Sequence, residues 1–374
     1  MMMKARQVDR TNNSSRFRAQ IGSSVLADPP SHFTVEKSLS EELLKLSFKD
    51  RSAIEEEIHG VSCGAAEETP ELIERSLLEF DSELFARKES DPKKHLLRNV
   101  VSISSFETNA AAATAYGSKP PGSNCYLNNP EVRLRFLRCE CFVVKKAVDR
   151  FVNFLDFTSE LFGDFVAERP IQVSDFNTKK EELALRNSRH QYLPFRDRSG
   201  RRVMVGVGAC GLDLDYVLKS KIIMYLHWVV SEDVETQRKG FVMLSWPFSE
   251  EEDSKTSWEK SIRPGMKNKL RIYHEKITKS MPVRLTSIQQ CYKDTPFNRA
   301  LSVLYFFGLD SHCRSIYKVH YGTLCSLFRE ISKSDPTISL QRILTMFIHH
   351  MYTDEPFLFS QFTKGNQPSF VILY

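Results

Sequence analysis

Leucine-rich segments with helical spacing fill the front of the chain, and capping signals mark where each helix begins. Ser38 precedes Glu41 by three residues, a capping-box pattern that predicts a helix opening at Ser38. A second helix is predicted over residues 50–60, where a glycine ends it. Thr69 followed by Pro70 predicts a third helix, with threonine as the N-cap and proline at the first helical position. The front of the chain is therefore predicted to be all-helical.

A second helical region follows a break in the pattern. Residues 109–128 hold an alanine run and then glycines, prolines and paired asparagines, a composition typical of a linker. Structure resumes after Pro130, where Val132 and Phe136 belong to a short predicted helix that ends in a turn near residues 139–142. A second helix repeats apolar residues at helical spacing between residues 143 and 155. These two amphipathic helices need a hydrophobic partner, which we expect to be the rest of the chain.

Beyond residue 163 the pattern changes to short β-type runs that alternate with helical stretches. The predicted strands lie near residues 202–206, 241–246, 284–291 and 316–321. This alternation predicts an α/β fold with a mainly parallel sheet and flanking helices. The predicted organisation is a disordered tail (1–37), a helical extension (38–108), a linker (109–128), a helical region (129–165) and an α/β module (166–374).

Composition narrows the class of protein. The 374 residues are 41% hydrophobic and 26% charged, as in ordinary globular chains, and the net charge of +5 is far below that of a typical nucleic-acid domain. The longest apolar run, at residues 222–230, is interrupted by His227 and is too short to span a bilayer. The eight cysteines form no C-x-x-C pair, which favours reduced thiols in a cytoplasmic protein. We expect no metal, no nucleic acid and no cofactor.

The positive charge is concentrated between residues 255 and 279, where eight basic residues face two glutamates. Such a stretch can contact an anionic membrane surface, at about 1 kcal/mol per basic residue near it. Lys267, Lys269 and Arg271 are the residues we expect to make that contact. The alternative is an ordinary solvated helical face.

Six segments in series resemble motifs of the CRAL-TRIO (Sec14-like) family. Residues 132–147, which read VRLRFLRCECFVVKKA, are similar to the LLRFLRARKFDVEKA stretch that opens the family's helical region. The other segments follow in the family's order and spacing: PFRDRSGRRV at 194–203, KGFVML at 239–244, MPVRLTSI at 281–288, TPFNRAL at 295–301 and CRSIYKVHYG at 313–322. The resemblance covers roughly residues 130–350.

This resemblance implies a non-catalytic protein that holds a lipid in an internal cavity, with a sheet as its floor and a mobile gate helix beginning near Pro296. The helix itself is apolar nearly all round, so it needs apolar partners on both sides, which a lipid cavity or an ordinary core would supply. The side chains expected to meet the ligand are Val205, Val207, Met243, Leu244, Ile288, Phe297, Ala300, Leu301, Leu304, Tyr305 and Lys318. The expected partners are the lipid and a membrane surface, and the front helices could add a protein partner.

Three departures from the family pattern leave the identity of the lipid open. Val283 stands where phosphatidylinositol-binding members have a glutamate, and Ile316 takes the place of a basic residue, with Lys318 two positions later. Ser245 and Trp246 replace the acidic residue that often ends the central strand. We therefore expect a remodelled mouth and keep lipid transfer, sensing and presentation as alternative roles.

Two other functions compete with lipid binding. Residues 206–211 read GVGACG, a G-x-G-x-x-G pattern that occurs in dinucleotide-binding enzymes, but the next predicted strand ends without the acidic residue that holds the ribose. Asp213 and Asp215 would also repel a pyrophosphate. The second competitor is an interaction module that keeps a Sec14-like fold and has lost its lipid. Because no G-x-S-x-G, H-E-x-x-H or phosphate-loop motif is present, the sequence nominates no catalytic residue.

Overall fold

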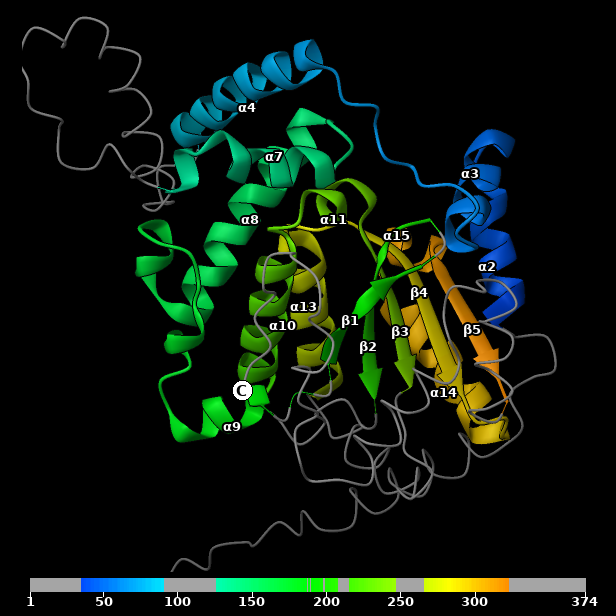
Figure 1. Cartoon of the computed structure of the whole chain (residues 1–374). Helices are drawn as coiled ribbons and strands as arrows, with labels where there is room; N and C mark the ends of the chain where they lie inside the picture. The colour runs from blue at the N-terminus through cyan, green and yellow to red at the C-terminus, as the bar shows by residue number, and fades with distance from the viewer. Residues whose placement is uncertain are drawn as a thin grey trace, which may run out of the picture.

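The computed structural model describes residues 35–90, 126–186, 188, 190–197, 199–207, 215–246 and 266–322. They form an α/β fold in which a mostly parallel sheet is flanked by helices (Figure 1). The coarse fold class predicted from the sequence is thereby confirmed. Most of the predicted tail at 1–37 and of the linker at 109–128 lies outside the described residues. Across the described ranges, no helix combines the length and the apolar character needed to cross a bilayer.

The sheet has five strands in sequence order. They are β1 (His190–Arg196), β2 (Arg202–Val207), β3 (Phe241–Trp246), β4 (Leu285–Tyr292) and β5 (Tyr317–Tyr321). β1 pairs with β2 in antiparallel fashion, whereas the other three pairs are parallel. Strands β2 to β5 correspond to the four predicted runs. β1 was not predicted, because its sequence HQYLPFR mixes polar residues and a proline with the apolar ones.

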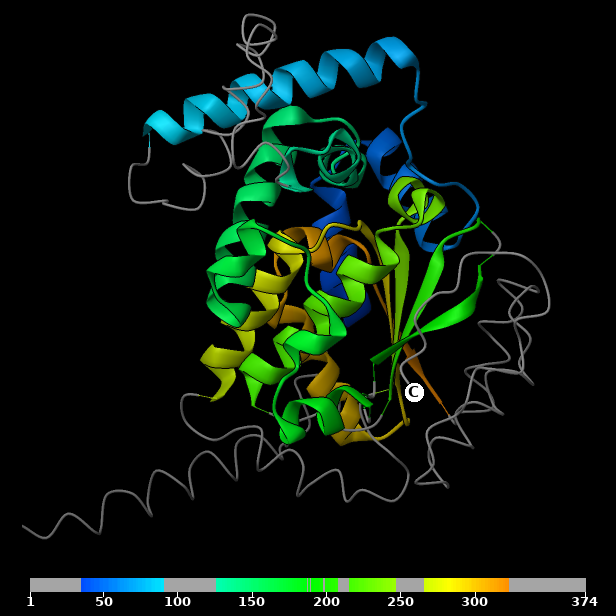
Figure 2. The same cartoon turned by 60° about the vertical axis from the view of Figure 1, so that its left-hand side comes forward.

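Helices connect the parallel strands on one side of the sheet. The chain passes through α10 (Tyr216–Val230) and α11 (Val234–Lys239) between β2 and β3, α13 (Met266–Ser280) before β4, and α14 (Pro296–Gly308) and α15 (Ser311–Ser315) before β5. Parallel neighbours require such crossovers. Figure 2, in which the sheet is seen close to edge-on, shows α10, α13 and α14 on the same side of it.

A second helical layer packs outside α10 and α13. It consists of α7 (Pro130–Cys139), α8 (Val144–Phe162), α9 (Lys179–Arg186) and the outermost helix α4 (Pro70–Ser90), with short 3-10 turns at Tyr126–Asn128, Asp164–Ala167 and Val173–Asp175. Phe136 and Phe154 are central to its contact with α10: ring centroids lie 5.1 Å apart for Phe136 and Phe151, 5.4 Å for Phe136 and Phe154, and 5.3 Å for Phe154 and Trp228 of α10. The predicted amphipathic pair therefore buries its apolar stripes against the α/β module, as expected.

The front of the chain adds α2 (Val35–Leu44) and α3 (Phe48–Ile58). The predicted start at Ser38 is wrong, because α2 begins at Val35 and Ser38 is buried inside it. The predicted cap at Thr69 is confirmed: its hydroxyl accepts a hydrogen bond from the Leu72 amide, and α4 begins at Pro70. A capping-box pattern marks a helix end only where the backbone also leaves the helical conformation. The sequence pattern alone does not show whether the backbone does so.

Ion pairs join this extension to α7 and to the α/β module. Glu57 pairs with Arg284, which precedes β4, at 2.7 Å, and both side chains are 14% exposed. Glu68 accepts hydrogen bonds from Arg138 of α7 and Arg238 of α11 at 2.8–3.0 Å. Such contacts need matching charges on segments far apart in sequence. The extension therefore packs beside the residues that precede β3 and β4.

Candidate functional site

The two faces of the sheet carry different side chains. Parallel register places Met204, Met243, Ile288 and Tyr317 in one row across β2 to β5. Because successive side chains point to opposite faces, the neighbouring row Val205, Leu244, Gln289 and Lys318 lies on the other face. We call the first the helix face and the second the valine face.

The helix face is filled by helices. Met204, Ile288 and Tyr317 share a hydrophobic cluster with Phe306 of α14 and Val35 of α2. The Phe306 ring lies 5.8 Å from that of Tyr317, and Phe306 retains only 1% exposure. At the other edge α10 covers the same face, where His227 hydrogen-bonds the Tyr192 hydroxyl at 2.7 Å. The helix face therefore serves as the core of the module.

The valine face is apolar over β2 and β3. Val203 and Val205 of β2 lie beside Val242 and Leu244 of β3, since the register pairs Val203 with Val242 and Val205 with Leu244. The four side chains are buried, with exposures of 3–8%. They form a continuous hydrocarbon surface of the kind that packs against an apolar partner.

The same face becomes polar over β4 and β5. Gln289 is central here: its amide donates to Ser287 Oγ at 2.6 Å and to the Ile58 carbonyl at 3.4 Å, and its Oε1 lies 2.7 Å from His320 Nε2. Lys318 Nζ lies 3.5 Å from Nδ1 of His59, which caps the end of α3. The valine face is therefore amphipathic, running from aliphatic to cationic across four strands.

The electrostatics of the polar half favour an anion. Burial, followed by the neighbouring Lys318 and His59, lowers the pKa of His320 from 6.5 to about 4. All three causes act in the same direction. An anion among these three groups would relieve their repulsion and raise the pKa of His320.

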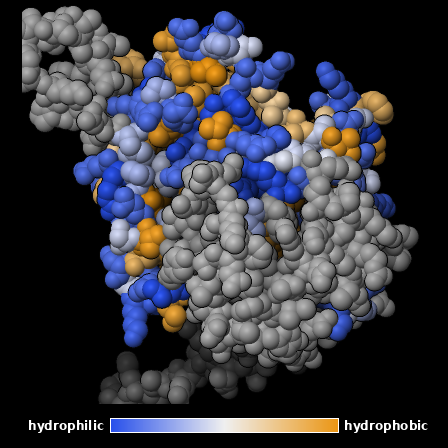
Figure 3. All heavy atoms as spheres, in the orientation of Figure 1, coloured by the Kyte–Doolittle hydropathy of each residue, from blue (hydrophilic) through white to orange (hydrophobic). Residues whose placement is uncertain are grey.

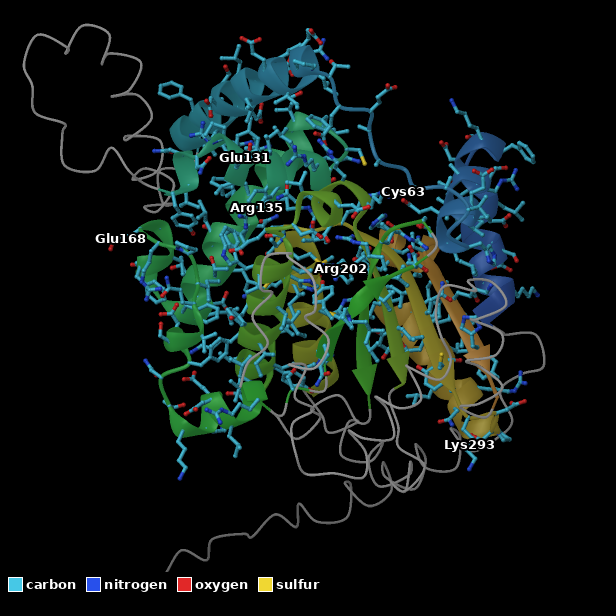
Figure 4. All side chains as sticks on the ribbon, in the orientation of Figure 1. Cys63, Glu131, Arg135, Glu168, Arg202 and Lys293 are labelled. Atoms are coloured by element: carbon cyan, nitrogen blue, oxygen red, sulfur yellow. The ribbon has the colours of Figure 1, made fainter. Side chains whose placement is uncertain are left out.

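The end of α3 completes this part of the site. Gly60 has a φ of +65°, and a Cβ there would lie 3.1 Å from the Arg201 guanidinium, so glycine lets the chain approach the start of β2 closely. Arg201 in turn pairs with Asp197 at 2.6 Å and donates to the Glu57 carbonyl. Figure 4 shows Cys63 on the segment that crosses from α3 to α4, and Arg202 at the start of β2. The extension thus supplies His59 and a carbonyl to the valine face.

The structure divides the ligand residues predicted from the sequence. Val205, Leu244 and Lys318 share one row of the valine face. Met243 and Ile288 lie on the helix face, because each is one position out of phase with that row. A single-strand pattern shows that side chains alternate, but not which half of them meets a ligand.

The predicted gate helix is α14, and it begins at Pro296 as expected, with Thr295 as its N-cap. Its described side chains pack on the helix face: Tyr305 lies 5.9 Å from Tyr317 between ring centroids, and Ala300 and Leu301 are half-buried. In this arrangement α14 does not lie over the valine face. Its role as a gate stays a prediction.

Several predicted residues cannot be placed. The side chains of Val207, Phe297, Leu304, Lys267, Lys269 and Arg271 lie outside the described part, although their backbones belong to β2, α14 and α13. Of the glycine-rich loop, only Gly206 and Val207 are described. Asp215 caps α10 by accepting a hydrogen bond from the Val217 amide at 3.2 Å, so a carboxylate occupies the helix end that a pyrophosphate would need.

Sequence reasoning missed His59, Ser287, Gln289 and His320. His59 is the C-cap of α3, and the other three residues lie in β4 and β5. Ser287 and His320 fall inside the segments 281–288 and 313–322 that resemble family motifs, but the resemblance gave them no role. Because Gln290 follows Gln289, β4 shows no clear alternation of polar and apolar residues, and the sequence does not identify the partners across strands. A scan of the sequence against family models finds no match, and a search of curated proteins finds none either.

Proposed function

We propose that the protein binds one amphipathic, anionic lipid against the valine face, with the acyl part over β2 and β3 and the anionic group near β5. The observation that carries the proposal is the row Val205, Leu244, Gln289 and Lys318, which changes from aliphatic to cationic within one register. Each methylene that leaves water contributes about 0.8 kcal/mol, so an aliphatic surface of this kind suits an acyl chain.

The polar half supplies the complementary recognition. Lys318 carries a full charge, and His59 and His320 can each donate to an oxyanion once protonated. Charge-assisted hydrogen bonds of this type are roughly twice as strong as neutral ones. Gln289 holds His320 from one side and the end of α3 from the other, so the groups are positioned before a ligand arrives.

The resemblance to the CRAL-TRIO family supports the same function. A mostly parallel sheet preceded by a helical region agrees with the architecture that the motifs imply. Our proposal includes membership of that family, an enclosed cavity and a gating helix. Lipid transfer, sensing and presentation are alternative uses of one binding event.

An interaction module without lipid is the second candidate, and one observation favours it. Val203, Val205, Val242 and Leu244 are already buried, to 3–8% exposure. A face that is permanently covered by protein would have no room for a ligand. Lipid content separates the two candidates.

Native mass spectrometry of the purified full chain tests the proposal. We expect a stoichiometric lipid with an anionic headgroup. The Lys318→Met variant removes the charge and keeps the length of the side chain, so it should lower the proportion of anionic lipid. Lys293→Met, at an exposed position after β4, is the matched control and should leave lipid content unchanged. Protein that carries no lipid under any condition would support the interaction module, and a bound nicotinamide nucleotide would support the enzyme.

A further inference from the structure

A helical corner of the extension exposes hydrophobic side chains that the fold leaves outside the core. α2 ends at Leu44 and α3 begins at Phe48, with Ser47 capping α3. Phe48 is 77% exposed and Leu44 is 68% exposed, and no other large hydrophobic side chain in the described ranges exposes a greater fraction. Isolated apolar residues on a surface are common, but these two flank one three-residue turn.

The buried ends of the two helices hold this corner in place. Val35 at the start of α2 is 2% exposed and joins the core of the helix face, and Ile58 at the end of α3 is 8% exposed. Both helices are therefore anchored at the ends away from the turn. Leu44 and Phe48 are exposed at the turn, whereas Val35 and Ile58 are buried at the opposite ends of the two helices. Packing among the described residues therefore does not explain why large apolar side chains occupy the turn.

The corner between α2 and α3 also carries charged residues. The corner, residues 43–51, reads LLKLSFKDR and carries three basic residues and one aspartate, and Glu41 and Glu42 directly precede it. Asp50 accepts a hydrogen bond from Ser47 Oγ at 2.6 Å and so belongs to the cap of α3. The acidic residues of α3 lie toward its far end, where Glu57 pairs with Arg284. The outer end thus carries the two most exposed large apolar side chains of the described residues beside Lys45, Lys49 and Arg51, with Glu42 paired to Lys45.

We propose that residues 43–51 insert into the surface of an anionic bilayer, with Leu44 and Phe48 entering the interface and the basic residues meeting lipid phosphates. Lys45 pairs with Glu42 at 3.1 Å while its side chain stays 67% exposed, and the Arg51 guanidinium lies 6.0 Å from the centroid of the Phe48 ring. Long basic side chains beside apolar ones can reach the headgroups while their neighbours enter the acyl boundary.

The bilayer is favoured over a protein partner because the apolar area is small and is flanked by cations. Two side chains at a turn fall far short of the roughly 800 Å² per partner that a stable protein interface buries. They suffice for reversible membrane contact when several basic residues assist at about 1 kcal/mol each. Figure 3 shows hydrophobic atoms exposed among hydrophilic ones on the α2–α3 side of the molecule.

Flotation of the full chain with vesicles tests this inference. The vesicles contain phosphatidylcholine with or without about one third phosphatidylserine, and we expect binding to the anionic ones. The double variant Leu44→Ser/Phe48→Ser should weaken that binding by at least tenfold, because two apolar side chains no longer enter the interface. The control Leu78→Ser/Phe85→Ser alters side chains of α4 that are 65% and 46% exposed, and it should bind as the wild type does.

Two further measurements separate the corner from the proposed lipid site. The corner variant should retain the lipid content and the melting temperature of the wild type, since both side chains are exposed. Emission of the Phe48→Trp variant should shift to shorter wavelength with anionic vesicles and be quenched by brominated lipid. Equal vesicle binding by the corner variant and the wild type would overturn the inference. A corner variant that still binds vesicles but no longer binds a protein partner would overturn it as well.

Discussion

Glu68 offers the sharpest test of how the extension is held. Its carboxylate pairs with Arg138 and Arg238, and the Glu68 and Arg138 side chains are 7% and 5% exposed. Burial by itself would raise the pKa of Glu68, but hydrogen bonds and charge from the two arginines outweigh it and lower the pKa from 4.5 to about 2. A pKa difference of about 2.5, at about 1.4 kcal/mol per unit, corresponds to about 3 kcal/mol of folding free energy.

The direction of the pH dependence follows from that pKa. Because the folded-state value lies below the unfolded-state value, this stability is fully present above pH 4.5 and is lost as the pH falls toward 2. Glu68→Gln should therefore destabilise the full chain by about 3 kcal/mol at pH 7, since it also leaves the Arg138 charge buried. The difference between variant and wild type should shrink to roughly 0.5 kcal/mol near pH 2, where Glu68 is about half protonated.

Urea unfolding at pH 7 and at pH 2 measures both effects. The control is Glu182→Gln, whose carboxylate pairs with Arg186 within α9 while both side chains are about half exposed. Exposed pairs of this kind contribute roughly 0.5 kcal/mol or less. A loss below about 1 kcal/mol for Glu68→Gln at pH 7, or an equal loss at both pH values, would refute the reasoning.

Three other predictions follow from the packing. Burial lowers the pKa of His227 to about 3, so this residue should contribute a loss of stability of about 1.4 kcal/mol per pH unit as the pH falls from 6.5 toward 3. Because other buried histidines also have lowered pKa values, His227→Gln should reduce the slope of stability against pH in acid unfolding by that amount and leave the remainder. Phe306→Ala should destabilise by about 3–5 kcal/mol in thermal or urea unfolding if α14 is a core helix; a smaller loss, with Ala300→Trp displacing lipid at unchanged stability, would support the gate. If the basic patch of α13 contacts the membrane, replacing Lys267, Lys269 and Arg271 with glutamate should weaken binding to anionic vesicles, in a salt-dependent manner. Unchanged binding of this triple variant would exclude the patch.

The sequence by itself determined the positions of most helices and of β2 to β5. Short β-type runs placed these four strands, and Thr69 with Pro70 marked the start of α4, because these signals depend on local backbone chemistry. A local signal also gave one wrong prediction: Ser38 lies three residues before Glu41, as in a capping box, yet α2 continues through Ser38. β1 escaped notice because an edge strand that gains stability from one neighbour needs little apolar pattern of its own.

Tertiary structure alone decided which residues share a site. Val205, Leu244 and Lys318 fall in one row because parallel register aligns three strands separated by long crossovers, and the same register assigns Met243 and Ile288 to the opposite face. His59 joins them from a helix 259 residues away in sequence from Lys318. Alternation within a strand can indicate two faces, but only the packed sheet and its helices decide which of the two faces α10, α13 and α14 cover.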